Sequence, residues 1–247
     1  MNLRRARNGR RMIFPSGSFE VQRMRSPRLS VLGLAAGAAV ALTSSVAPAQ
    51  QLKAASWQDS WFWGAYGGYT SLATSVARTN APTVGAEWVI TRSRFALNLF
   101  AEQSYFNAVS TIVDFPTTAP RRVDITDMRR FGFAAMIFTP EFKALKPYVG
   151  LGYSMNFIKT GTPQGSSFAS PQARDSVLSR VKNARAAGKP FGDIGLMYIW
   201  HRFAPFAQYT VMPTKGTGNW FVNGEGFTNI WSAGLRFNFG SSIERNW

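Results

Sequence analysis

The chain has 247 residues, no cysteine, a single histidine and a formal net charge of +16. The lack of cysteine excludes a disulfide framework and thiolate metal sites, and 45% hydrophobic and 14% aromatic residues exclude a disordered polypeptide. Residues 1–49 carry eight of the 28 basic residues and one of the 12 acidic ones, so residues 50–247 have a net charge of 20 − 11 = +9. Because much of the positive excess lies in a segment that we expect to be removed, the charge is not taken to indicate a nucleic-acid partner.

An export signal is the first element expected along the chain. Residues 24–28 form a short basic region, 29–46 an apolar, alanine-rich core, and 47–49 an Ala-Pro-Ala site that predicts cleavage before Gln50. A membrane anchor is the alternative, and the short core with its Gly and Ser residues disfavours it. We expect 1–49 to be an N-terminal extension plus a cleaved signal peptide (the signal proper at about 24–49, with Met24 as the true start) and 50–247 to be the second domain.

Beyond the signal, apolar and polar residues alternate with a period of two, which is typical of β-strands. No apolar run of about 18 or more residues occurs there, so membrane-spanning helices are not expected. The last segment has Trp231, Leu235 and Phe239 on one face and Ser232, Gly234 and Arg236 on the other. Eight such segments are predicted as strands: 61–69, 83–91, 94–106, 128–138, 148–159, 191–201, 205–212 and 231–239.

The connections between these strands alternate between long and short. Outer-membrane barrels have short periplasmic turns and long outer loops, and a soluble barrel has no reason to show this alternation. The sequence therefore predicts an all-β fold, an eight-stranded antiparallel up-and-down transmembrane β-barrel with short periplasmic turns and long extracellular loops. A short helix is expected within the third long loop, at 174–187. The predicted long loops are 71–82, 107–127, 160–190 and 213–226.

Two segments resemble a known family, the small eight-stranded outer-membrane barrels of Gram-negative bacteria (opacity-porin, OmpA-barrel and OmpW-like). Residues 146–153, Lys-Pro-Tyr-Val-Gly-Leu-Gly-Tyr, look like a strand of that family, and 232–239 look like the terminal signal that the barrel assembly machinery recognises. The resemblance covers roughly 57–247, although this chain continues past the signal to Trp247. It implies contact with periplasmic chaperones and the assembly machinery during biogenesis, through Ser232, Gly234, Phe237 and Phe239.

Four charged residues are predicted to face the lumen: Glu87, Glu102, Arg130 and Arg236. Buried charges need partners, and the two signs are matched in number, so we expect a structural network. A proton or ion path is the alternative reading. Because side chains just fill the interior of an eight-stranded barrel, any conduction is expected to be small.

The outward aromatic residues are expected to form interfacial girdles, since amphipathic rings favour the headgroup level of a membrane. These are Trp61, Trp63, Trp88, Tyr153, Tyr209 and Trp231. The third long loop is basic. Its charge is compatible with contacts to lipopolysaccharide phosphates or host polyanions, and equally with a solvated loop that binds no ligand. Its basic residues are Arg174, Arg180, Lys182, Arg185 and Lys189.

The expected function is structural or surface interaction: envelope integrity, or adhesion to a host or surface ligand through the outer loops. A narrow channel for small or hydrophobic molecules is the alternative. A lipid A-modifying enzyme is less favoured, because His201 lies at a predicted short turn and has no serine two residues away, as a deacylase of this kind would require. No catalytic residue, metal or cofactor is expected.

Overall fold

The structure is a computed structural model that describes residues 57–114, 118–139, 144–165, 167–214, 220–224 and 226–242. The export signal, its cleavage before Gln50 and the division of the chain at residue 49 lie outside these residues and stay predictions.

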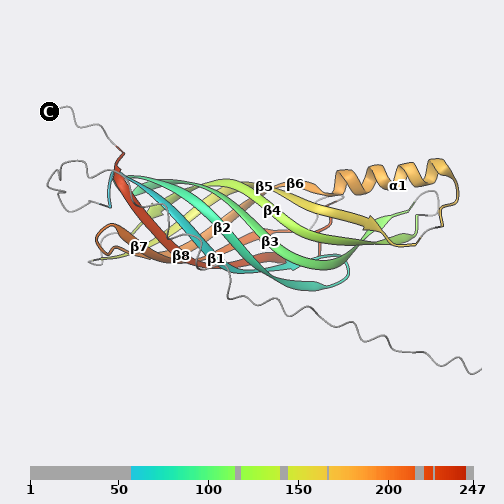
Figure 1. The fold of residues 1–247 in the computed structure, drawn as a ribbon, viewed down its shortest axis with the longest axis horizontal. Helices are drawn as coiled ribbons and strands as arrows, with labels where there is room; N and C mark the ends of the chain where they lie inside the picture. Colours follow the sequence, from blue (N-terminus) through green and yellow to red (C-terminus); the bar gives the residue numbers. More distant parts are fainter. Residues whose placement is uncertain are drawn as a thin grey trace, which may run out of the picture. The chain divides into compact units, whose positions relative to one another are not determined.

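Eight antiparallel strands form a closed barrel in which each strand pairs with its neighbours in sequence and β8 pairs with β1 (Figure 1). The predicted closed, antiparallel barrel of eight strands is confirmed. Its strands are β1 (Ser60–Ala73), β2 (Arg78–Arg92), β3 (Phe95–Val113), β4 (Pro120–Phe138), β5 (Leu145–Pro163), β6 (Ala186–Tyr198), β7 (Phe203–Pro213) and β8 (Phe227–Ser241).

The two ends of the barrel differ. At one end, called here the terminal end because β1 starts and β8 finishes there, two connections are two- to four-residue turns at 93–94 and 199–202. The other end, called the loop end, holds the connections 74–77, 114–119, 164–185 and 214–226. Figure 1 shows α1 at the loop end, opposite the end of β8.

Two of the predicted long loops are wrong, because most of 71–82 and 107–127 is strand. Apolar and polar residues still alternate in these extensions, but here the apolar residues face the lumen and the polar residues face outward. Val123 and Ile125 are buried inside the barrel, whereas Arg122 and Asp124 are exposed outside. Water rather than lipid surrounds a wall with such an exterior, so a search for outward apolar residues overlooks these strand ends.

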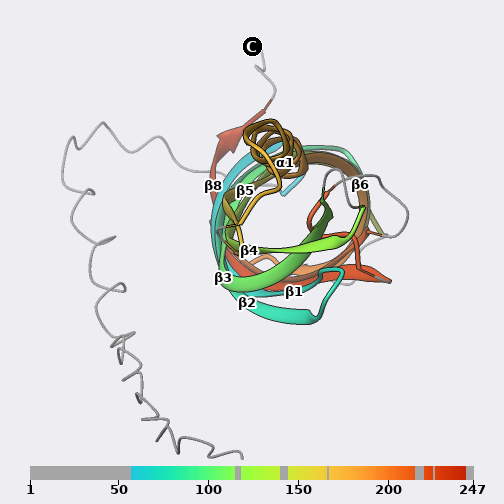
Figure 2. The ribbon, with the colours of Figure 1, turned by 90° about the vertical axis from the view of Figure 1, so that its right-hand side faces the viewer.

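One helix, α1 (Pro171–Ala184), follows β5, three residues ahead of the predicted 174–187. It begins where Ser170 caps it by accepting a hydrogen bond from the Ala173 N–H (3.1 Å), with proline in the first turn. Seen along the barrel, the helix lies against one side of the ring of strands (Figure 2). Its buried face repeats at helical spacing and consists of Ala173, Val177, Val181 and Ala184. Among the described residues, no helix has the length and hydropathy needed to cross a membrane.

The seam between β6 and β7 is short, with six register pairs from Gly192–Val211 to Met197–Phe206. The same register, continued by two residues, would place Pro190 opposite Pro213. Neither proline has an N–H to donate, so the β6–β7 hydrogen bonds end before these two residues are reached from the terminal end. At the loop end, fewer strand pairs therefore hold β6 to β7 than hold β3 to β4, which pair from Phe95–Ile137 to Val113–Pro120.

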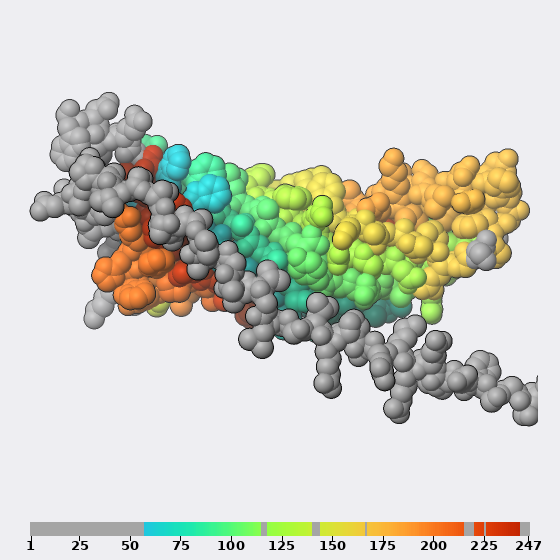
Figure 3. Space-filling view, viewed as in Figure 1, coloured from blue at the N-terminus to red at the C-terminus, as the bar shows by residue number. Residues whose placement is uncertain are grey.

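The outer face of the wall is apolar along its middle. Large hydrophobic side chains point outward and are exposed on every strand, whereas a soluble protein buries most such side chains in its core. Figure 3 shows this wall from one side, with residues of β5 and α1 (yellow and orange) extending the loop end. Such a band is what hydrocarbon requires, and closure of the sheet leaves no unpaired strand edge within it. Members of the band include Leu97, Phe131, Phe133, Ile137, Val149, Leu151, Ile194, Leu196 and Leu235.

Candidate functional site

The first ion pair of the lumen joins β2 to β8. Arg236 donates from Nε to Glu87 Oε1 (2.8 Å) and from Nη2 to Glu87 Oε2 (3.1 Å), and its side chain is fully buried. Asn98 donates to the same carboxylate (3.1 Å), and the guanidinium lies 3.9 Å from the ring centre of Phe206. Two-pronged pairing with a flat ring on one side gives the arginine a fixed position in the middle of the barrel.

The second ion pair joins β3 to β4. Arg130 Nε lies 2.8 Å from Glu102 Oε1, and its Nη2 donates to Glu102 Oε2 (3.0 Å). The Tyr66 hydroxyl donates to that carboxylate from β1 (3.1 Å), and Phe100 lies under the guanidinium at 4.6 Å. The four charged residues predicted to face the lumen are thus inside it, as two separate pairs; their role as a structural network stays a proposal.

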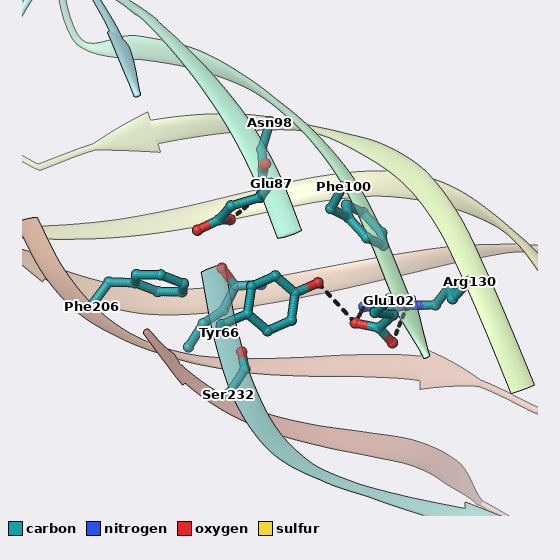
Figure 4. A pocket seen from close by; sticks show the side chains of 9 residues that line it. Tyr66, Glu87, Asn98, Phe100, Glu102, Arg130, Phe206 and Ser232 are labelled. Carbon is teal, nitrogen blue, oxygen red and sulfur yellow. Dashed lines mark hydrogen bonds and ion pairs between the residues drawn. The ribbon is translucent and has the colours of Figure 1, made fainter. Parts of the chain in front are cut away.

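A small cavity lies between the two ion pairs (Figure 4), with Tyr66 reaching toward Glu102 and Arg130. Its volume is about 10 Å³, which holds about one water molecule. Its wall includes residues from six strands: Tyr66, Glu87, Asn98, Phe100, Glu102, Arg130, Phe206, Gln208 and Ser232. Side chains therefore fill the middle of the lumen, as expected for eight strands.

A third carboxylate, Asp193, lies in the lumen and was not foreseen from the sequence. It is 7% exposed, and neither of its oxygens has a hydrogen-bond partner among the described residues. Gly150 makes room for it on the neighbouring strand, since a Cβ there would overlap the carboxylate. The sixth strand was predicted without assigning its faces; the exposed Ile194 and Leu196 would have shown that Asp193 points inward.

Tyr148, on β5, was also missed as a partner in the lumen. Its hydroxyl donates to Gln208 (2.9 Å) and accepts a longer contact from Arg236 (3.5 Å). The ring lies over Gly195, where a Cβ would collide with it. A glycine facing an aromatic residue on the next strand was the available signal.

Among the described residues, side chains or backbone pack across each end of the lumen. At the terminal end, Trp57 and Phe138 pack with their rings 5.1 Å apart, and Lys146 lies 5.0 Å from the Trp57 ring. At the loop end, residues 220–224 cross the mouth: Phe221 N–H donates to Ala184 O (3.3 Å) and Gly224 N–H to Ala73 O (2.9 Å).

The side chains packed at the loop end form an apolar group that we call the outer plug. Its members belong to β4, β5, α1 and the 220–224 segment, and all are buried. Ser110 holds the segment in place by donating to Phe221 O (2.8 Å). The predicted loop 213–226 thus contains a buried apolar stretch at 220–222, which the sequence prediction did not single out. The outer plug comprises Ile125, Ile158, Val177, Val181, Phe221 and Val222.

The predicted girdle residues all face outward, in two groups. Trp61, Trp63 and Trp88 cluster toward the terminal end, with Trp88 5.3 and 5.5 Å from the other two rings. Tyr209 and Trp231 pack toward the loop end at 4.2 Å, and Tyr153 is exposed on β5. Two aromatic levels separated by an apolar band suit the two interfaces of a membrane, and the girdle assignment stays a prediction.

The predicted assembly signal lies along β8. Ser232 and Gly234 face the lumen, and Gly234 lets β1 approach, since a Cβ there would collide with Ala65 O. Phe237 and Phe239 face outward with rings 5.0 Å apart. Recognition of these residues by the assembly machinery stays a prediction.

His201 lies in the turn between β6 and β7 with φ of 56°, next to Trp200 at 5.8 Å. Within the described part of the chain, no three His, Asp or Glu side chains are grouped as metal ligands would be. Of the basic residues predicted in the third loop, Lys189 is buried inside the barrel, 5.0 Å from the Trp220 ring. The other four lie on or directly after α1, at the loop end.

Comparison with known proteins finds no matching family model and no matching curated sequence. Among solved structures, neisserial surface protein A is similar at 14% identity and a TM-score of 0.49, over 72% of this chain and 97% of that one. A de novo designed transmembrane β-barrel matches at 11% identity and a TM-score of 0.40, over 74% and 98%. The attachment invasion locus protein Ail of Yersinia pestis, in complex with a heparin analogue, matches at 8% identity and a TM-score of 0.39, over 74% and 99%.

Strand order, closure and the outward apolar band decide the architecture. This chain is a small eight-stranded transmembrane β-barrel.

Proposed function

We propose that this barrel resides in the bacterial outer membrane and has a structural or surface-interaction role, with a lumen that acts as a packed core rather than a conduit. The observation that carries the proposal is the filled interior: two buried ion pairs, a cavity of about 10 Å³ and an apolar plug at the loop end. A hydrated ion needs a continuous water path, and a space for about one water molecule does not supply one.

The features available to a partner are then on the outside. The two longest connections, 164–185 and 214–226, both lie at the loop end, which suits an extracellular side there and a periplasmic side at the terminal end. The loop end carries strand extensions and α1 with the exposed cations Arg174 and Lys182. A cationic surface of this kind, in the water beyond the membrane, favours soluble anionic partners such as host polyanions.

Planar-bilayer recording of the refolded chain tests the proposal. We expect no stepwise conductance, because the ion pairs and the outer plug remain in place at the applied potential. A variant with Phe221→Ala and Val222→Ala is the matched control: it loosens the plug and leaves the middle of the lumen filled, so it should also stay closed. A reproducible open state in the unaltered chain would instead support the channel alternative.

A further inference from the structure

Three cations gather at the loop-end border of the apolar wall formed by β4 and β5. Arg129 is exposed on β4 and pairs in register with Phe157 of β5. Lys159, two residues further along β5, has a side chain that is 53% exposed. Arg185, which directly follows α1, donates from Nε to Ile158 O (2.9 Å) and from Nη2 to Lys159 O. Strand pairing and the end of the helix thus place all three around the same stretch of β5.

The position of this group along the wall is as informative as its charge. On the side of the cations nearer the middle of the barrel, the outward residues of β4 and β5 are apolar or aromatic and exposed. They are Phe131, Tyr153, Met155 and Phe157. Toward the loop end the outward residues become polar, beginning with Thr160. The three cations therefore lie where hydrocarbon gives way to headgroups.

The charges of the group do not cancel. Asp127 is the carboxylate that contacts it, with its Oδ2 3.5 Å from Lys159 Nζ, and it is partly buried. Arg129 Nε donates to the uncharged Gln103 (3.0 Å). With Asp127 counted, Arg129, Lys159 and Arg185 leave two positive charges in excess. Their mutual repulsion at a low-dielectric border falls when an anion joins them.

We propose that Arg129, Lys159 and Arg185 bind the phosphate of a phosphorylated glycolipid of the outer leaflet, whose acyl chains lie against Phe131 and Phe157. Guanidinium groups fit phosphate oxygens with two parallel hydrogen bonds, and the ammonium adds a point charge. The apolar wall below the cations selects an anion carried by a lipid over a free one. The inference rests on the proposed outer-membrane location and is independent of whether the lumen conducts.

Heat unfolding of the purified full barrel, followed by its shift in gel migration, tests this site. The barrel is measured in zwitterionic detergent alone, with purified lipopolysaccharide, with dephosphorylated lipopolysaccharide, and with inorganic phosphate. We expect lipopolysaccharide to raise the unfolding temperature and the other two additions to leave it unchanged. An equal rise with inorganic phosphate, or with the dephosphorylated lipid, would overturn the proposal.

The test variant carries Arg129→Gln, Lys159→Gln and Arg185→Gln. Each cation near an anionic membrane surface strengthens binding about fivefold, so lipopolysaccharide should bind this variant about a hundredfold more weakly. The matched control carries Arg122→Gln, Arg174→Gln and Arg180→Gln, which remove the same charge from the same end, and should keep the full rise. Equal losses in both variants would show a diffuse charge effect and refute a defined site.

Lys159→Gln alone keeps the test decisive if the triple variant does not fold, because this side chain is half exposed and its removal leaves the contacts of Arg185 in place. We expect about fivefold weaker binding from it. Unchanged binding would refute the role of Lys159. Failure here leaves the closed-lumen proposal intact, since bilayer recording judges that separately.

Discussion

The middle of the lumen and its loop end are built on opposite principles, although the same strands surround both. In the middle, the wall is apolar outside and charged inside, with Glu87–Arg236 and Glu102–Arg130 neutralising each other. At the loop end, the wall is polar outside and apolar inside, with Ile125 and Phe221 among the buried residues. The sense of a β-strand's two faces therefore follows the solvent around it: lipid around the middle, water around the loop end.

This difference predicts that the middle determines the stability of the whole barrel, whereas the outer plug holds only the loop end together. The largest expected effect is that of Arg236→Glu. It puts a second carboxylate beside Glu87 with no cation to balance either, and breaking a buried pair alone costs about 3–5 kcal/mol. We expect the barrel not to refold, measured as loss of the heat-modified gel band.

The charge-swapped variant with Glu87→Arg and Arg236→Glu should recover part of the refolding, because it restores a pair of opposite charges between β2 and β8. Unchanged migration of Arg236→Glu by itself would show that this ion pair does not stabilise the middle of the lumen.

A matched pair of phenylalanine truncations gives the next effect. Phe206→Ala removes the ring under Arg236 in the middle of the lumen, and should lower the free energy of unfolding by about 3–5 kcal/mol. Phe221→Ala makes the same change in the outer plug. We expect it to lower the free energy of barrel unfolding by less than about 1 kcal/mol, because the plug region opens locally. Denaturant titration measures both.

Limited proteolysis completes this comparison. Phe221→Ala should speed cleavage within 171–184, because Phe221 packs with Val181 around Gly161, and Phe206→Ala should not. Equal losses of unfolding free energy in the two variants would mean that the middle of the lumen and its loop end unfold as one unit.

The smallest effect concerns the seam where the two regions meet. Pro190→Val with Pro213→Val supplies two N–H groups at the end of the β6–β7 ladder, and each new hydrogen bond contributes about 1 kcal/mol. We expect slower amide exchange in β6 next to residue 190 and a slightly higher unfolding midpoint. Exchange as fast as in the unaltered chain would show that something other than the missing N–H groups ends the ladder.

Sequence patterns were most informative where lipid surrounds the wall. Alternation placed all eight strands and the inward direction of Glu87, Glu102, Arg130 and Arg236, because residue period and solvent contrast are local properties. It was misleading at the loop end, where 71–82 and 107–127 are mostly strand, because a polar exterior removes the contrast on which the prediction depended. The helix was found within three residues, since its alanine- and arginine-containing stretch has helical preference wherever it packs.

Around the middle of the wall, the sequence by itself indicated which side chains face outward and which face the lumen, because neighbouring residues of a strand point to opposite faces. Only the tertiary structure decided which charges meet. Glu87 and Arg236 are 149 positions apart and become partners when β8 closes on β1. Closure also decided that residues 220–222 turn into the mouth of the barrel, since their burial depends on α1 and on strands from distant parts of the chain.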